Sequence, residues 1–139
     1  DFSMMPDAAM TMAAVACFAE GTTTITGLRT LRVKETDRLA AVKNEMSKIG
    51  ARVEIFSYAD EDGCVDEGLR ITPPRGGVDC SAGVERVVFE TYDDHRMAMS
   101  LALIGLRRPN VVIREPQCVA KTYSTFWRDW AGIYESGAR

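Results

Sequence analysis

The chain repeats part of its own pattern at a distance of 87 residues, and this repeat constrains the possible folds more than any other feature. When the sequence is moved along itself by that distance without a gap, identical residues meet at several positions. Among these pairs are Asp7 and Asp94, Met10 and Met97, Met12 and Met99, and Lys34 and Lys121. Such identities can arise by chance, but the predicted helices and strands recur in the same order, which favours duplication. The period is too long for a solenoid repeat and fits a duplicated α/β unit.

The first half of the chain predicts a helix, a strand and a second helix. Asp7 and Gly21 are suited to cap and to end a helix over residues 8–20, and residues 22–26 form a β-branched run. The apolar residues of the second helix recur every three or four positions before Gly50, which is suited to end it. They are Leu39, Val42, Met46 and Ile49. This spacing predicts one narrow buried face.

Two strands follow, over residues 51–58 and 69–72, and an acidic segment separates them. Its carboxylates, which we interpret as a solvated turn, belong to Asp60, Glu61, Asp62, Asp66 and Glu67. The second half predicts strand, helix, strand and helix. These elements cover residues 84–90, 94–107, 110–114 and 122–134. With 139 residues and 46% hydrophobic content, the chain can bury one core. We therefore expect the α/β class.

Charge and hydropathy exclude two classes of partner. The 17 basic and 20 acidic residues give a net charge of −3, so no uniform positive field is available for nucleic acid. The most apolar stretches, residues 8–19 and 97–106, are far shorter than the roughly 20 residues that cross a bilayer. We expect neither a nucleic-acid partner nor a membrane span. Any anion site must be a local cluster of cations.

The cysteines indicate neither a metal site nor a disulfide framework. Four cysteines are widely spaced and form no CxxC pair, and His95 is the one histidine that could help to bind a metal. We expect no metal, reduced thiols and a cytoplasmic location, since no targeting pattern is visible. The chain begins with Asp1 rather than Met and enters a helix almost at once, so we expect that it was cut from something longer.

Charged residues gather at the junctions that lead into helices. The first group falls within residues 32–38, the second is the run 93–96, and Lys121 stands alone before the last helix. Helix N-termini favour anions, and Lys and Arg beside them bind phosphate or carboxylate. Asp7 and Glu35 are then the candidates for proton transfer.

Each of these residues also has a purely structural interpretation. Asp7 and Asp94 are both well suited to cap a helix. The segment 34–38 fits a solvated first turn, and His95 fits a hydrogen-bonded structural residue. Composition and spacing alone leave these alternatives open.

Five motifs together carry a resemblance to a known family. They are Pro6-Asp7-Ala8-Ala9-Met10, Gly21-Thr22-Thr23-Thr24, Arg32-Val33-Lys34-Glu35-Thr36-Asp37-Arg38-Leu39, Tyr92-Asp93-Asp94-His95-Arg96-Met97-Ala98-Met99 and Cys118-Val119-Ala120-Lys121-Thr122. In this order and spacing they resemble the C-terminal part of the 5-enolpyruvylshikimate-3-phosphate (EPSP) synthase family. The third and fourth motifs are specific enough to be persuasive alone.

The resemblance implies a fold of repeated βαβαββ units in the inside-out α/β barrel of the enolpyruvyl transferases. Family enzymes have two domains of three such units. Residues 1–139 would form a single partial domain with about two units, over residues 1–75 and 84–139. The N-terminal domain of the same enzyme would be absent from this chain and would be its partner.

The resemblance also implies a reaction, in which the enolpyruvyl group of phosphoenolpyruvate passes to the 5-hydroxyl of shikimate 3-phosphate with release of phosphate. No metal or organic cofactor is implied. Asp7 and Lys34 would bind shikimate 3-phosphate, with Asp7 helping to remove the 5-hydroxyl proton, and Glu35 would protonate the methylene carbon of phosphoenolpyruvate. The residues expected at phosphoenolpyruvate are Glu35, Arg38, His95, Arg96 and Lys121.

Two alternatives remain beside this interpretation. One is the sister family that acts on UDP-N-acetylglucosamine, which shares the fold and the enolpyruvyl donor. The other is an inactive fragment that keeps the anion-binding cations without turnover. For the EPSP synthase interpretation, we expect the chain alone to be inactive. We expect its location to be the cytoplasm, or a plastid where the parent belongs to a plant or alga.

Overall fold

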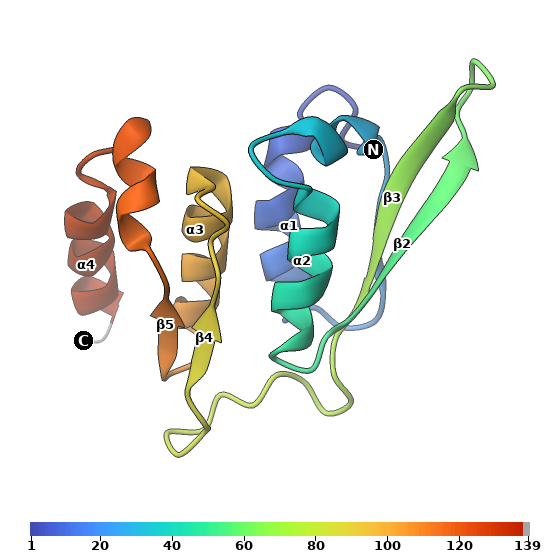
Figure 1. The fold of residues 1–139 in the computed structure, drawn as a ribbon. Coiled ribbons are helices and arrows are strands. Elements are labelled where there is room, and N and C mark those ends of the chain that lie inside the picture. Colours follow the sequence, from blue (N-terminus) through green and yellow to red (C-terminus); the bar gives the residue numbers. More distant parts are fainter. Residues whose placement is uncertain (138–139) are drawn as a thin grey trace.

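A computed structural model describes residues 1–137 as two halves that lie side by side (Figure 1). The first half contains the 3-10 helices η1 (Pro6–Ala8) and η2 (Arg29–Val33), the α-helices α1 (Ala9–Ala16) and α2 (Arg38–Ser47), and the strands β1 (Thr23–Ile25), β2 (Arg52–Ala59) and β3 (Val65–Thr72). The second half contains the strands β4 (Val87–Phe89) and β5 (Val111–Ile113), the α-helices α3 (His95–Ala102) and α4 (Phe126–Gly137), and the 3-10 helices η3 (Leu103–Leu106) and η4 (Pro116–Lys121). The predicted α/β class is confirmed.

The three strands of the first half form one antiparallel sheet in the order β1-β3-β2. β2 and β3 pair along their whole length, from Arg52 opposite Thr72 to Ala59 opposite Val65. The predicted strand over residues 69–72 is therefore too short. Asp66 and Glu67 belong to β3, where they pair with Tyr58 and Ser57 of β2. Their carboxylates are not solvated, because Asp66 accepts the Arg29 amide and Glu67 pairs with Arg32.

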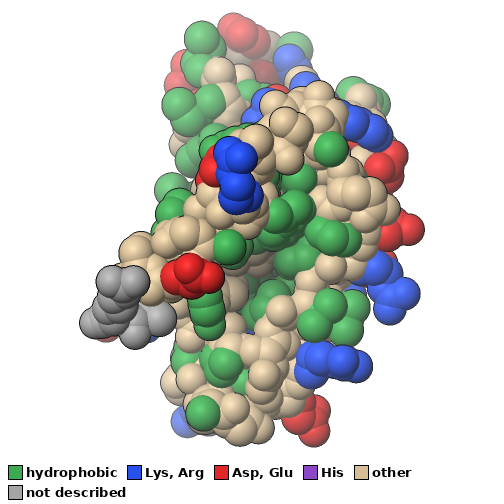
Figure 2. Space-filling model, turned by 90° about the vertical axis from the view of Figure 1, so that its left-hand side faces the viewer, with side chains coloured by type: hydrophobic (Ala, Val, Ile, Leu, Met, Phe, Trp, Pro, Cys, Tyr) green, Lys and Arg blue, Asp and Glu red, His purple; other side chains and the backbone are tan. Residues whose placement is uncertain are grey.

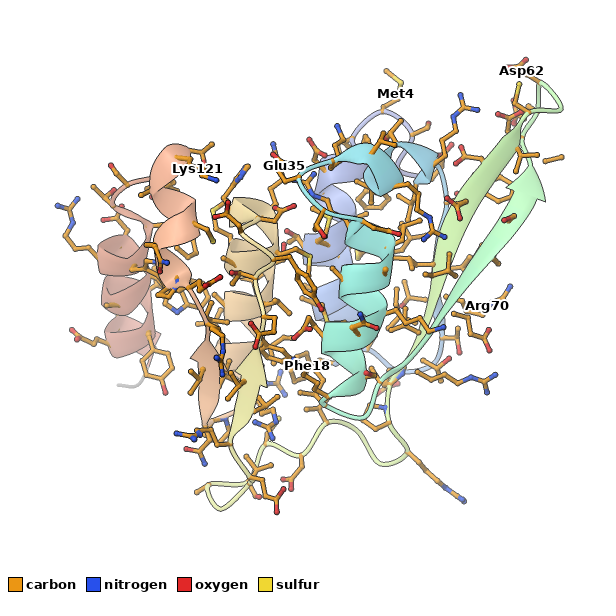
Figure 3. The ribbon with its side chains drawn as sticks, in the orientation of Figure 1. Met4, Phe18, Glu35, Asp62, Arg70 and Lys121 are labelled. Carbon is orange, nitrogen blue, oxygen red and sulfur yellow. The ribbon has the colours of Figure 1, made fainter. Side chains whose placement is uncertain are left out.

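The turn at the end of this hairpin is shorter than the acidic segment suggested. The Asp60 side chain accepts the backbone N–H groups of Asp62 and Cys64, at 3.1 and 2.7 Å. Figure 3 shows Asp62 at the tip of the projecting hairpin. The solvated-turn interpretation holds for residues 60–62 and is wrong for the carboxylates of β3.

The first helix ends earlier than predicted. α1 stops at Ala16, four residues before Glu20, because the following amides bond three residues back: Phe18 to the carbonyl of Val15 and Ala19 to that of Ala16. The predicted helix over 94–107 likewise divides into the α-helix α3 and the tighter 3-10 helix η3, which ends at Leu106. Both corrections concern helix ends, where the chain changes from i−4 to i−3 bonding.

The same elements recur along the two halves. Ala9 and His95, which begin α1 and α3, lie 86 residues apart; Thr23 and Val111, which begin β1 and β5, lie 88 apart. The starts of η2 and η4 lie 87 residues apart, and those of α2 and α4 lie 88 apart. The second half differs in its sheet, where β4 and β5 pair in parallel.

One buried cluster joins the two halves. Met10 and Met46 of the first half and Phe89, Met97 and Leu101 of the second are fully buried in it. The Thr11 and Ser100 hydroxyls, on α1 and α3, lie 3.1 Å apart across the same boundary. Residues 73–86 connect the halves along one edge (Figure 1). Within residues 1–137, no helix is both long enough and apolar enough to span a bilayer.

Candidate active site

The charged junctions predicted from the sequence converge at one end of the molecule. Glu35 and Lys121 come from different halves, and both lie at the end where α2 and α3 begin (Figure 3). Lys34 directly follows η2, and Lys121 is the last residue of η4. The repeat therefore places the two lysines at equivalent positions on the same side of the molecule.

Arg38 is the centre of this cluster. Its side chain is only 1% exposed, although it carries a full charge. The guanidinium donates from Nε to Asp94 Oδ2 at 2.7 Å, from Nη1 to Asp7 Oδ1 at 2.8 Å and from Nη2 to Glu35 Oε2 at 2.8 Å. Such charge-assisted hydrogen bonds are stronger than neutral ones. One arginine therefore fixes three carboxylates from three segments of the chain.

Asp94 is the buried partner of Arg38. It is fully buried and caps α3, accepting the backbone N–H groups of Arg96 at 2.9 Å and Met97 at 3.3 Å. Both of its oxygens also accept from Arg38, Oδ2 from Nε and Oδ1 from Nη2 at 3.2 Å. Burial by itself lowers the pKa of Arg38. The hydrogen bond and charge of Asp94, with the charges of Glu35 and Asp7, outweigh that effect and raise the pKa of Arg38. The capping interpretation of Asp94 is confirmed.

Asp7 does not cap a helix. It lies within η1, which has no side-chain cap, and its carboxylate is about one-third exposed and surrounded by cations. Oδ1 lies 2.8 Å from Arg38 Nη1 and 3.7 Å from Lys34 Nζ, while Oδ2 lies 3.5 Å from Arg96 Nη2. The capping alternative for Asp7 is wrong, because the 3-10 turn at Pro6 carries its side chain toward α2 and α3.

Glu35 is the more exposed of the two candidate proton-transfer groups. Its side chain is 45% exposed, with Oε2 on Arg38 and Oε1 4.0 Å from His95 Nδ1. His95 itself is 12% exposed. Glu35 can therefore reach a molecule in solvent while one oxygen stays fixed.

Lys121 approaches the cluster from the second half. Its Nζ donates to Asp93 Oδ2 at 2.8 Å, and this hydrogen bond raises the pKa of Lys121. The side chain is 61% exposed. The Lys121 ammonium is thus held at the solvent-exposed edge of the charged cluster, beside the loop that contains Asp93 and Asp94.

The interpretation of residues 34–38 as a solvated first turn is wrong for Arg38, which is buried. Asp37 does cap α2, accepting the Ala40 amide at 3.1 Å. Arg32 pairs with Asp37 and Glu67, at 2.8 and 2.6 Å, and these two hydrogen bonds raise its pKa. Arg32 and Asp37 are therefore occupied by structural contacts within the first half.

Three acidic residues were assigned no role in the site from the sequence, although two of them belong to the charged run 93–96. Asp94 neutralises Arg38, Asp93 holds Lys121, and Glu45 contacts the loop that follows β4. The burial of Glu45 could have been predicted from the sequence, because this residue falls three residues after Val42 within the apolar stripe of α2. The pairing of Asp94 with Arg38 could not, since the two residues are 56 positions apart.

Comparison with known proteins gives the family. The EPSP synthase family model, described as 3-phosphoshikimate 1-carboxyvinyltransferase, matches residues 1–130. The chain belongs to the EPSP synthase family. It is 47% identical over 133 residues to the 3-phosphoshikimate 1-carboxyvinyltransferase of Nitrosomonas europaea, covering 96% of this chain and 27% of that protein. The corresponding enzyme of Thiobacillus denitrificans is also 47% identical, with 96% and 28% covered.

A solved structure shows the same relationship. The EPSP synthase from Acinetobacter baumannii superimposes with a TM-score of 0.69 at 29% identity, covering 93% of this chain and 27% of that one. The chain thus spans about a quarter of the length of its EPSP synthase relatives. The family membership agrees with the resemblance carried by the five motifs.

Proposed function

We propose that this chain is the C-terminal portion of an enzyme that transfers the enolpyruvyl group of phosphoenolpyruvate to the 5-hydroxyl of shikimate 3-phosphate. The observation that carries the proposal is the pair of carboxylates, Asp7 and Glu35, held on the two terminal nitrogens of Arg38. The reaction requires one group that removes a proton and one that supplies it. The names of the family relatives support this reaction.

The two carboxylates suit separate roles. Asp7, with three cations around it, would take the proton of the 5-hydroxyl as its oxygen attacks C2 of phosphoenolpyruvate. Glu35, exposed and beside His95, would give a proton to C3, which becomes a methyl group. In the resulting tetrahedral intermediate, the Glu35 carboxylate would take a proton back from that methyl group as phosphate leaves C2, which restores the carbon–carbon double bond.

The cations suit the two anionic substrates. Lys34 would bind shikimate 3-phosphate next to Asp7, whereas Arg96 and Lys121 would bind phosphoenolpyruvate and the departing phosphate. His95 would hydrogen-bond nearby. Arg38 would contribute to the phosphoenolpyruvate carboxylate through the second N–H of Nη1, since its other donors hold Asp7, Asp94 and Glu35. Positioned cations of this kind stabilise the charge that develops during the transfer.

The remaining three quarters of the enzyme would supply the rest of the site. Relatives are about three and a half times as long as this chain, so the chain alone is expected to lack turnover. We place the reaction in the cytoplasm, or in a plastid for a plant or algal parent. The four free cysteines fit such a reducing compartment.

The test uses a chimera in which this chain replaces the matching 133-residue segment of the Nitrosomonas europaea relative. Phosphate release from phosphoenolpyruvate is measured with the chain alone and with the chimera, in the presence and absence of shikimate 3-phosphate. We expect release only from the chimera and only with both substrates. Release with UDP-N-acetylglucosamine instead would favour the sister reaction. A folded chimera that binds both substrates without turnover would favour an anion-binding role.

A further inference from the structure

The loop between β4 and α3 has a backbone conformation that ordinary residues rarely adopt. Tyr92 and Asp93 are both left-handed, with φ angles of 56° and 52°. They directly precede Asp94, His95 and Arg96. Consecutive left-handed residues of this kind persist only where the surrounding structure fixes them.

The contacts that fix this loop come from α2. The Glu45 side chain is 1% exposed, and its Oε1 accepts the Tyr92 hydroxyl at 2.7 Å. Its Oε2 accepts the backbone N–H of Glu90 at 3.0 Å and lies 2.5 Å from Lys48 Nζ. Lys48 also donates to the Val88 carbonyl at 3.0 Å. The buried carboxylate is thus neutralised by Lys48 and joined to the beginning of the loop.

The same helix also carries the centre of the active site. Arg38 lies seven residues before Glu45, which is close to two helical turns and places both side chains on one face of α2. Arg38 holds Asp94 at the end of the loop, and Glu45 holds Glu90 and Tyr92 at its beginning. The left-handed turn is therefore fixed to α2 at both ends.

We propose that Glu45 is a positioning residue for the active site. By holding Tyr92 and Glu90, it sets the left-handed turn and hence the positions of His95 and Arg96 relative to α2. The proposal rests on the proposed function above. Asp7 and Lys34 come from η1 and the end of η2, outside this loop. Loss of the Glu45 contacts should therefore affect phosphoenolpyruvate more than shikimate 3-phosphate.

The test compares Glu45→Gln, Tyr92→Phe and the double variant in the Nitrosomonas europaea chimera. Each single variant should raise the KM for phosphoenolpyruvate roughly 10-fold or more, because small displacements of binding groups have large kinetic costs. The KM for shikimate 3-phosphate should change less than about two-fold. The double variant should lose no more than the more damaging single variant, since both substitutions act on the same contact between Glu45 and Tyr92. Matched controls are Glu61→Gln and Tyr134→Phe, at exposed positions.

Hydrogen exchange measured by mass spectrometry on residues 88–97 gives a second readout. Exchange there should increase in both single variants, and Tyr92→Phe keeps the test valid if Glu45→Gln does not fold. Unchanged exchange, equal effects on the two KM values, or independent effects that multiply in the double variant would each overturn the positioning role. An unsubstituted chimera without turnover would instead overturn the proposed function, and the role with it.

Discussion

Arg38 shows how a single residue organises the candidate site. A buried guanidinium is unfavourable unless its charge is compensated, and three carboxylates from separate segments surround this one. Asp94 is buried with it, whereas Asp7 and Glu35 are partly exposed. The buried member of this network should therefore govern stability, and the exposed members should govern chemistry.

Replacing Asp94 by Asn should separate these effects, because Asn still caps α3 but removes the charge opposite Arg38. We expect the free energy of unfolding to fall by about 3 kcal/mol, at the low end of the range for a broken buried pair because two carboxylates remain on Arg38. Urea denaturation of the chain measures this change. A decrease below about 1 kcal/mol would show that Asp7 and Glu35 alone neutralise Arg38.

Replacing Glu35 by Gln should have the opposite effect, with a large loss of turnover and little loss of stability. Gln keeps the shape of the side chain but cannot donate a proton to carbon. We expect the turnover number of the chimera to fall by roughly 100-fold or more. Stability should change by less than about 0.5 kcal/mol, because the side chain is 45% exposed. Steady-state phosphate release and thermal unfolding measure the two quantities, with Glu61→Gln as control. Turnover near that of the unsubstituted chimera would remove Glu35 from its proposed role.

At the scale of elements, the repeat places equivalent residues at equivalent junctions. A 3-10 helix precedes the last helix in each half, and Lys34 and Lys121 lie at the ends of η2 and η4. The first half adds the β2–β3 hairpin, whose second strand pairs with β1. The loop that supplies Glu35 is anchored to this sheet through Arg32 and Glu67.

Close packing of β3 against β1 depends on Gly68. A Cβ there would lie 2.7 Å from the Ile25 carbonyl and 2.5 Å from Phe56 Cζ. The backbone contact cannot be relieved by a rotamer change, so Gly68→Ala should lower the free energy of unfolding by about 1 to 3 kcal/mol. Gly83→Ala is the matched control, since nothing lies within 4 Å of its Cβ position. Equal midpoints for the two variants in urea denaturation would contradict this account of the sheet.

At the scale of the whole molecule, the two halves differ in how their last helices are covered. The buried Leu39, Val42 and Met46 of α2 lie 88 residues before Trp127, Trp130 and Tyr134 of α4. None of the α4 residues is buried, and these three line a hollow of about 450 Å³ beside β5. Figure 2 shows hydrophobic side chains gathered around a hollow on the face where α4 lies.

This uncovered face predicts self-association of the chain alone. An exposed aromatic surface of this kind promotes association and binds hydrophobic dyes. We expect concentration-dependent dimers or larger species in analytical ultracentrifugation, together with fluorescence of bound anilinonaphthalenesulfonate. Trp130→Glu should reduce both, whereas Val33→Glu, at an 82% exposed position elsewhere, should not. Equal association of the two variants would show that another surface is responsible.

The sequence alone determined those features that depend on residues close together in the chain. Helical periodicity located α2, and the side chain of Asp94 set the start of α3. The repeat predicted equivalent elements in both halves, and four of the five motifs contain the candidate site residues. Helix ends were less accurate, because i−3 and i−4 bonding differ little in their sequence requirements.

Only the tertiary structure decided which charges meet. Asp7 and Asp94 occupy equivalent positions in the repeat, yet one faces solvent among cations and the other is buried against Arg38. Asp66 and Glu67 look like loop residues but belong to a strand, and Glu45 is a charged residue in an apolar stripe. The physical reason is that the cost of burying a charge depends on its partners. Those partners come from distant segments that only the folded chain brings together.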